Sequence, residues 1–467
     1  MRGRRGLPAG ALLTALVAAG PVATPTAAVD LWRDGGRSLE ASGSVRELVT
    51  LTRGTRGSLF ARRAASAGPP CALAQLFPDC PAFDAVGELD VFESLTRMRL
   101  QLDGRWSARW SARIVYDHEL RFGMLDRLTD RLAQPPETFL GAEAEIHAFG
   151  LADDRDHRRW RHALYRGYLR YEGDHVELTV GRQRIPWGVG RLWNPIDRFN
   201  AIPPLAVEGD QSPGIDAVEA RWLFSGFSYL QAVYAPATRS RDARYAIRWQ
   251  GVLRDVDVSV MAGVFEQART LGGDLSGNLG EGAWRLEAVW TDPERRIWPV
   301  GDRRPRELGR FWQVVLSFDR NIDVGTGIYV LVEHLYDGNA LGFGEGRAGT
   351  LLPLFASSDR APTGGKGLSG PFVEPVGSER FGGSGVVSLA RQTTGLQLGY
   401  DLATSLRGDL LLLHDWNGAS DALFATLSFT GWNTAELRAG VQVFRGPRLS
   451  AFGDQEPLFF VLAEWFF

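Results

Sequence analysis

Residues Pro457–Phe467 read PLFFVLAEWFF, and this stretch decides the fold class. Side chains alternate between the two sides of a β-strand. One face of this stretch therefore carries Phe459, Val461, Ala463, Trp465 and Phe467. Exposed rings give a soluble protein no advantage, whereas a strand that faces lipid needs an apolar outer face and an aromatic side chain at the membrane interface. We predict a lipid-facing strand, and a buried strand of a soluble sheet is the alternative.

The beginning of the chain reads as a secretory signal. A basic start (MRGRR) precedes an apolar run from Leu7 to Val22, and Thr26-Ala27-Ala28 fits the small-residue cleavage rule. We therefore assign residues 1–28 to a signal peptide and residues 29–467 to one domain. No run of about twenty apolar residues follows the signal, so helical membrane spans are not expected.

The net charge narrows the choice of partners. The formal charge of the sequence is −3, and removal of the three signal arginines, with no acid lost, takes it to about −6. This balance argues against a protein that binds nucleic acid.

Alternation of apolar and polar residues predicts eighteen strands, and a count of sixteen also fits. The segment Ala268–Leu275 is counted as a strand because the long 291–309 connection would otherwise lie on the side of the tight turns. The predicted strands are Val45–Arg53, Glu88–Leu102, Arg105–His118, Trp160–Glu172, Val176–Val180, Gly214–Phe224, Phe227–Ala235, Asp242–Gly251, Asp255–Glu266, Ala268–Leu275, Gly280–Thr291, Gly309–Arg320, Asp323–Tyr336, Val386–Leu402, Ser405–Trp416, Asp421–Gly431, Thr434–Phe444 and Pro457–Phe467.

Tight turns alternate with long connections along this series. The predicted tight turns are Asp103-Gly104, Gly173-Asp174, Ser225-Gly226, Ser276-Gly277-Asn278 and Arg320-Asn321. The long connections lie near residues 54–86, 119–159, 183–213, 292–308 and 338–385. This arrangement is typical of an all-β transmembrane antiparallel barrel with short periplasmic turns and long extracellular loops. An even number of strands leaves both termini in the periplasm.

The two cysteines, Cys71 and Cys80, lie in one loop-like segment. In an exported protein, an even pair in one loop predicts a local disulfide. A metal site is the rival interpretation, but no histidine lies nearby, so no metal is expected.

Arginines on three neighbouring strands are expected to point into the lumen, which is aqueous in a barrel of this width. Such a ladder of guanidinium groups would favour anionic solutes. Acids at other lumen-facing positions, including Glu287 and Glu333, could instead form ion pairs with these arginines. The pairs would then only stiffen the wall. The same alternation places His162 inward and Tyr165 outward. The predicted pore arginines are Arg97, Arg99, Arg109, Arg113, Arg166 and Arg170.

The most distinctive loop is 181–204, GRQRIPWGVGRLWNPIDRFNAIPP. Gly188 and Gly190 permit sharp turns, four prolines stiffen the loop, and its large rings are unlikely to stay in water. We predict that it folds inward as a constriction or binding platform, and a purely structural plug is the alternative. Its candidate constriction residues are Arg184, Trp187, Arg191, Trp193 and Asp197.

Three stretches resemble a group of porin-like bacterial outer-membrane proteins. They are GRQRIPWGVGRLWNPIDRFN (181–200), FWQVVLSFDRNIDVGTGIYVLVEHLYDG (311–338) and the aromatic C-terminal strand. The resemblance implies a passive or substrate-selective channel in the bacterial outer membrane, and it implies no particular solute. The C-terminal strand also resembles the signature that the barrel-assembly machinery reads. The cysteine loop and the 338–385 stretch are not part of the resemblance.

Other functions are less well supported by the sequence. The seven histidines are scattered, and no nucleophile-elbow or two-histidine zinc motif accompanies them, so an outer-membrane hydrolase is not expected. A barrel that binds or exports a surface polysaccharide stays an alternative, because several tryptophans lie in loops. We expect a channel for small polar or anionic solutes without a cofactor. Its partners would be the lipid bilayer and the solutes, and a homotrimer stays open.

Overall fold

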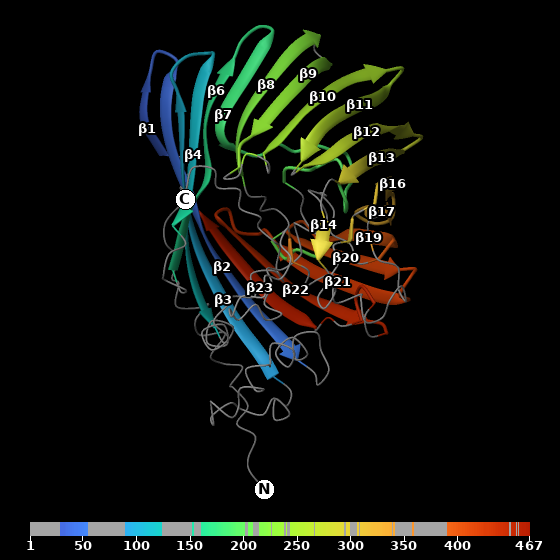
Figure 1. Cartoon of the computed structure of the whole chain (residues 1–467). Coiled ribbons are helices and arrows are strands. Elements are labelled where there is room, and N and C mark those ends of the chain that lie inside the picture. Colours follow the sequence, from blue (N-terminus) through green and yellow to red (C-terminus); the bar gives the residue numbers. More distant parts are fainter. Residues whose placement is uncertain are drawn as a thin grey trace, which may run out of the picture.

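A computed structural model gives the fold of the chain (Figure 1). The predicted signal peptide and both cysteines, Cys71 and Cys80, lie outside the described residues, so these two assignments stay predictions. The structure describes residues 29–54, 89–123, 152–153, 160–200, 204–208, most of 214–340, 357–358 and most of 390–467.

The described residues form a closed antiparallel barrel of 18 strands. Each strand pairs with the next one along the chain, and the last strand pairs with the first to close the wall. The barrel strands are β2 (Arg37–Gly54), β3 (Leu89–Arg105), β4 (Trp110–Gly123), β6 (Trp160–Glu172), β7 (Val176–Gln183), β8 (Ile215–Ser225), β9 (Ser228–Ala235), β10 (Arg244–Leu253), β11 (Val256–Phe265), β12 (Ala268–Leu279), β13 (Gly282–Pro293), β16 (Phe311–Ile322), β17 (Ile328–Asp337), β19 (Gln392–Ala403), β20 (Leu406–Asp415), β21 (Ser420–Phe429), β22 (Ala435–Arg445) and β23 (Leu458–Phe466).

Short strands lie outside this wall. β1 (Val29–Asp34), which the alternation did not predict, pairs with the beginning of β2, so β2 begins at Arg37 and not at Val45. The remaining short strands are β5 (Ala152–Asp153), β14 (Arg296–Trp298), β15 (Arg306–Glu307) and β18 (Ser357–Ser358). None of the described residues forms an apolar helix long enough to cross a bilayer.

The predicted number and order of strands are confirmed, and the β6 boundaries match the prediction. The predicted turn at Asp103-Gly104 is wrong, because β3 continues to Arg105 and the chain turns at residues 106–109. Asp103 stays in the strand because it lies opposite Arg113 in the register and accepts its Nε–H at 2.5 Å.

Two other predicted turns are also displaced. Residues 276–278 lie inside β12, where Gly277 is packed beneath the ring of Trp284, and the chain turns after Leu279. β16 continues to Ile322, and the turn that follows uses Gly325 and Gly327 at φ values of 65° and 100°. Positive φ is the conformation that favours glycine, so these glycines fix where the chain reverses.

A β-bulge changes the faces predicted for two residues of β6. The register between β4 and β6 shifts between Val115 and Tyr116, whose partners are Arg166 and Leu164, so Tyr165 is the extra residue. Tyr165 points into the lumen, where the Arg99 guanidinium lies 3.7 Å from its ring centroid. His162 lies on the outer wall, opposite His118. Both assignments made from simple alternation were therefore wrong.

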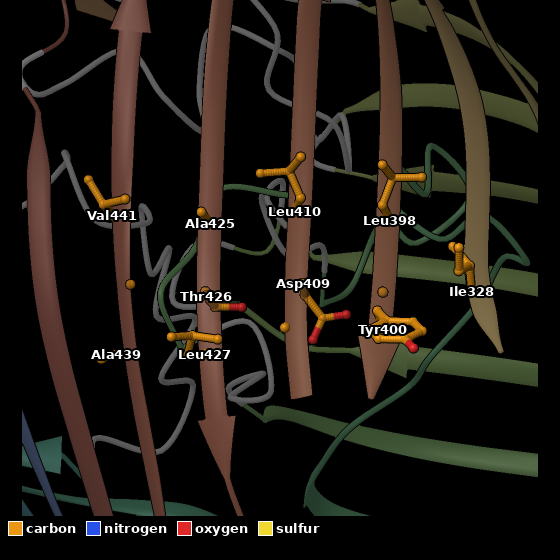
Figure 2. A pocket seen from close by; sticks show the side chains of 13 residues that line it. Ile328, Leu398, Tyr400, Asp409, Leu410, Ala425, Thr426, Leu427, Ala439 and Val441 are labelled. Carbon is orange, nitrogen blue, oxygen red and sulfur yellow. The ribbon is translucent and has the colours of Figure 1, made fainter. Parts of the chain in front are cut away.

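The outer wall is apolar over most of its area. A shallow hollow of about 630 Å³ crosses β17, β19, β20, β21 and β22 (Figure 2). Small residues at Gly408, Ala425 and Ala439 form its floor, and Leu398 and Leu410 are among the larger side chains that line it. Packing of lipid chains suits such a surface.

Replacement of Leu316 by arginine tests which face of the wall meets lipid. Leu316 is 58% exposed on the outer side of β16. We expect Leu316→Arg to lower the free energy of unfolding from vesicles by about 2–4 kcal/mol, because a cation near the bilayer centre loses its hydration. Reversible urea unfolding in lipid vesicles measures this change.

The matched control is Ser276→Arg. Ser276 lies on the lumen face of β12, directly opposite Asp257, which can accept the new cation. The loss of stability should be far smaller than for Leu316→Arg, and equal losses would contradict the assignment of the two faces.

Candidate functional site

The connection between β7 and β8 folds into the barrel. Its apolar side chains are buried against the inner wall: Ile185, Trp187, Ile196 and Phe199 are each at most 5% exposed. They form one cluster with residues of β8, β9, β10, β11 and β13: Ile215, Ala217, Val233, Ala235, Ala246, Met261, Phe265 and Val289. We call residues 184–208 of this connection the inner loop, of which 184–200 and 204–208 are described.

The inner loop also contacts the opposite wall. Leu192 and Trp193 pack in a second cluster with Val315, Leu331 and Leu413 of β16, β17 and β20. Farther along, Gln442 of β22 donates to the Leu205 carbonyl at 2.7 Å, and Val207 packs on Leu48, Leu458, Phe460 and Leu462. The inner loop therefore crosses the lumen and contacts both sides of the barrel.

A buried carboxylate of β13 holds the first turn of the inner loop. Glu287 accepts backbone N–H groups from Val189 at 2.5 Å, Gly190 at 2.7 Å and Ile196 at 3.3 Å. Gly190 is needed here because a Cβ would lie 2.0 Å from the Trp193 carbonyl oxygen. The predicted sharp turn is thus confirmed, with a wall residue as its hydrogen-bond acceptor.

A second wall carboxylate holds the next residues. Glu333 of β17 accepts the N–H groups of Arg191 at 2.8 Å, Leu192 at 2.9 Å and Trp193 at 2.7 Å. Charge-assisted hydrogen bonds of this kind are about twice as strong as neutral ones. The alternation had offered Glu287 and Glu333 as partners for lumen arginines, and the structure instead uses them to bind the loop backbone.

The ends and the centre of the inner loop are also fixed. Arg182 and Asp216, on the strands that flank the loop, form a buried bidentate ion pair with both distances at 2.9 Å. Trp187 donates its indole N–H to Gln231 at 2.9 Å. Asp197 accepts the N–H groups of Phe199 at 3.2 Å and Asn200 at 2.7 Å, which closes a local turn.

Two of the predicted pore arginines, Arg97 and Arg99, lie on the lumen wall beside buried acids. Arg97 bonds to Glu119 at 2.7 Å and to Glu208 of the inner loop at 2.7 Å. Arg99 makes a bidentate contact with Asp117 at 2.7 and 2.6 Å.

The other predicted wall arginines have different surroundings. Arg113 pairs with Asp103, and Arg170 lies 3.1 Å from Glu172 and 3.4 Å from Glu177. Arg166 stacks on the Tyr165 ring at 4.2 Å. Arg109 lies in the exposed turn between β3 and β4, 3.1 Å from Asp174, and not on a strand as predicted.

The inner loop presents Arg184 and Arg191 to a polar cavity. A cavity of about 340 Å³ is lined by the loop backbone around Gly188, by Arg184 and Arg191, and by Arg285 of β13. Arg184 and Arg191 are exposed, and within the described part of the chain their guanidinium groups form no ion pair. Asn194, Asp197 and Ser276 supply further polar groups.

The predicted constriction residues therefore divide into two roles. Arg184 and Arg191 face the cavity, whereas Trp187, Trp193 and Asp197 are buried and hold the loop in place. Sequence reasoning missed the functions of Glu208, Asp216, Glu287 and Glu333. One sequence signal could have indicated such an acid: a carboxylate at a lumen-facing position with apolar lumen-facing residues on either side. Glu333, between Leu331 and Leu335, is an example.

Comparisons with known proteins show similarity of fold. Acinetobacter baumannii OccAB1 has a TM-score of 0.52 and 8% identity, with 91% of this chain and 96% of that chain covered. Pseudomonas aeruginosa OccK5 (OpdH) has a TM-score of 0.49 and 8% sequence identity, with 91% of this chain and 97% of that chain covered. The outer-membrane protein OpdK from Pseudomonas aeruginosa has a TM-score of 0.48 and 9% sequence identity, with 91% of this chain and 98% of that chain covered. No protein-family model and no curated protein matches the chain.

The closed barrel and its apolar outer wall place the protein in the bacterial outer membrane. The wall satisfies its backbone hydrogen bonds internally, as the hydrocarbon requires. The lumen then carries the polar and charged side chains, and the inner loop determines what remains open.

Replacement of the wall carboxylates tests how the inner loop is held. We expect Glu287→Gln and Glu333→Gln each to destabilise the loop by about 1.5–3 kcal/mol, because each change removes charge from an acceptor of three N–H groups. Protease cleavage within 184–208, in folded protein, measures loop opening.

Glu436→Gln serves as the control, because Glu436 is an exposed acid of β22. Cleavage rates equal to those of the wild-type protein in both loop-anchor variants would contradict the anchoring role.

The inner loop should respond to pH through Asp197, which lies outside the membrane-spanning strands. Burial raises the pKa of the Asp197 carboxyl to about 6, against the opposing effect of the N–H groups of Asn200 and Phe199. Because the folded pKa is above the ordinary 3.8, ionisation at neutral pH destabilises the loop, and this penalty is relieved as the pH falls through about 6. Protease cleavage of the loop should therefore be slower near pH 5 than near pH 7.5.

Asp197→Asn keeps an oxygen acceptor for both N–H groups but does not ionise in this range. The variant should lose most of the pH dependence, after correction for the intrinsic pH dependence of the protease. An unchanged pH profile would show that another group is responsible.

Proposed function

We propose that the protein is an outer-membrane diffusion channel for small polar solutes, with a preference for anions. The observation that carries the proposal is the inner loop, which crosses the lumen and leaves Arg184 and Arg191 exposed beside a polar cavity. A solute that passes the loop meets these guanidinium groups where the path is narrow. Because the low-dielectric wall focuses their field, they lower the barrier for an anion more than for a cation.

Charge selectivity in this proposal resides in the loop and not in the wall. Arg97, Arg99 and Arg113 are paired with carboxylates, so their fields are largely compensated. The cavity contains one acid, Asp197, which is 5% exposed and has a raised pKa because of its burial. Arg184 and Arg191 therefore dominate the field of the cavity, because the third arginine, Arg285, is paired with Asp319.

The proposed role involves no catalysis and no cofactor. Among the described residues, no group of three or more histidine, cysteine or acidic side chains is arranged to hold a metal ion. The closing strand β23 is the segment that we propose the barrel-assembly machinery recognises, because it carries outward aromatic rings and closes the wall against β2.

Single-channel recording tests the proposal. The refolded protein is reconstituted in planar bilayers, and reversal potentials under a KCl gradient give the ratio of anion to cation permeability. We expect an anion-preferring pore, and we expect Arg184→Ala/Arg191→Ala to reduce the permeability ratio several-fold, because the two exposed cations are lost.

Arg109→Ala is the matched control, because it removes an exposed arginine from the turn between β3 and β4. The ratio should stay unchanged in that variant. A protein that shows no conductance would contradict the channel, whereas an open pore whose ratio is unaffected by the double variant would contradict the role of the loop arginines.

A further inference from the structure

The outer wall departs from the apolar pattern at Glu47 of β2. Arg46 of β2 points into the lumen, where it bonds to Glu464, so the next residue, Glu47, lies on the outer face. Its carboxylate accepts hydrogen bonds from the Ser94 and Thr96 hydroxyl groups of β3, both at 2.5 Å. An acid is thus held on the lipid-facing side by two neutral donors.

Two imidazoles lie on the same outer face, on the strands β4 and β6. Glu47 lies opposite Thr96 of β3. The next outward residue of β3 is Met98, which lies opposite His118 of β4. His118 is in turn opposite His162 of β6, with their ring centroids 6.1 Å apart. We call Glu47, Ser94, Thr96, Tyr116, His118 and His162 the polar patch; the Tyr116 hydroxyl contacts Nδ1 of His162.

The polar patch lies within the level of the apolar belt. The preceding outward residue of β2 is Val45, which lies opposite Trp465 of β23. Farther along the same face, Leu51 lies opposite Phe459. The outward residues of β11 show the usual composition of the wall: Val256, Val258, Val260, Ala262 and Val264. A carboxylate at this level costs free energy in lipid, since acyl chains can neither donate a hydrogen bond nor supply a countercharge.

We propose that the polar patch is the surface through which two copies of this chain associate in the membrane. The acid lies on the β2 side of β3, and the imidazoles lie on the β4 and β6 side. A twofold axis along the membrane normal would exchange these sides, so Glu47 of each copy would approach the imidazoles of the other. The surface is thus complementary to itself, as a symmetric dimer contact requires.

Dimerisation in lipid tests the proposal. The full-length protein is labelled with one fluorophore per chain and diluted in vesicles, and stepwise photobleaching gives the dimer fraction at each ratio of protein to lipid. We expect wild-type dimers, and we expect Glu47→Val to raise the dissociation constant at least about tenfold, equivalent to ~1.4 kcal/mol. His162→Leu should have an effect in the same direction.

The variants are chosen so that misfolding cannot explain the result. Valine matches Val45 and Val49, so Glu47→Val should insert into membranes at least as well as the wild-type protein. Thr394→Val is the control, because it removes a polar group from the outer wall of β19, away from the polar patch, and should leave the dimer fraction unchanged. Monomers at every ratio, or dimers that persist unchanged in Glu47→Val, would overturn the proposal.

Discussion

Every backbone N–H group inside this barrel must find an acceptor, and this requirement shapes both the wall and the loop within it. In the wall, the strands satisfy one another, and β23 closes the circle by pairing with β2. The inner loop has no neighbouring strand to bond with. Glu287 and Glu333 substitute for such a strand, because each accepts three N–H groups from the loop. The position of the inner loop follows from these two carboxylates.

Electrostatic pairing then separates structural arginines from available ones. The wall near β2–β4 carries many guanidinium groups, but Glu119, Asp117, Asp103 and Glu208 neutralise them locally. Glu208 comes from the inner loop and bonds to both Arg46 and Arg97, so the loop is part of this network. The charges that remain exposed beside the cavity belong to the loop itself. The count of arginines on a wall is therefore a poor guide to the field in a lumen.

Alternation along the chain, together with the order of tight turns and long connections, was sufficient to predict the barrel and its strand number. The inward fold of the 181–204 stretch was predicted from its glycines, prolines and large rings. Alternation failed where local packing or pairing overrode the pattern. Asp103 kept β3 extended through its pair with Arg113, and the extra residue at Tyr165 reversed the faces assigned to His162 and Tyr165. The roles of Glu287 and Glu333 could not be read from sequence, because their partners lie 91 to 142 positions away along the chain. A wall acid that binds a backbone and one that pairs with arginine look alike until the fold brings them together.

The order of these elements along the chain has a consequence for assembly. The inner loop is synthesised before β13 and β17, which carry its two carboxylates, and before β22, whose Gln442 holds the Leu205 carbonyl. The loop cannot reach its final position until the C-terminal half of the wall has formed around it. The contacts that hold the loop across the lumen would thus be complete only as the wall closes.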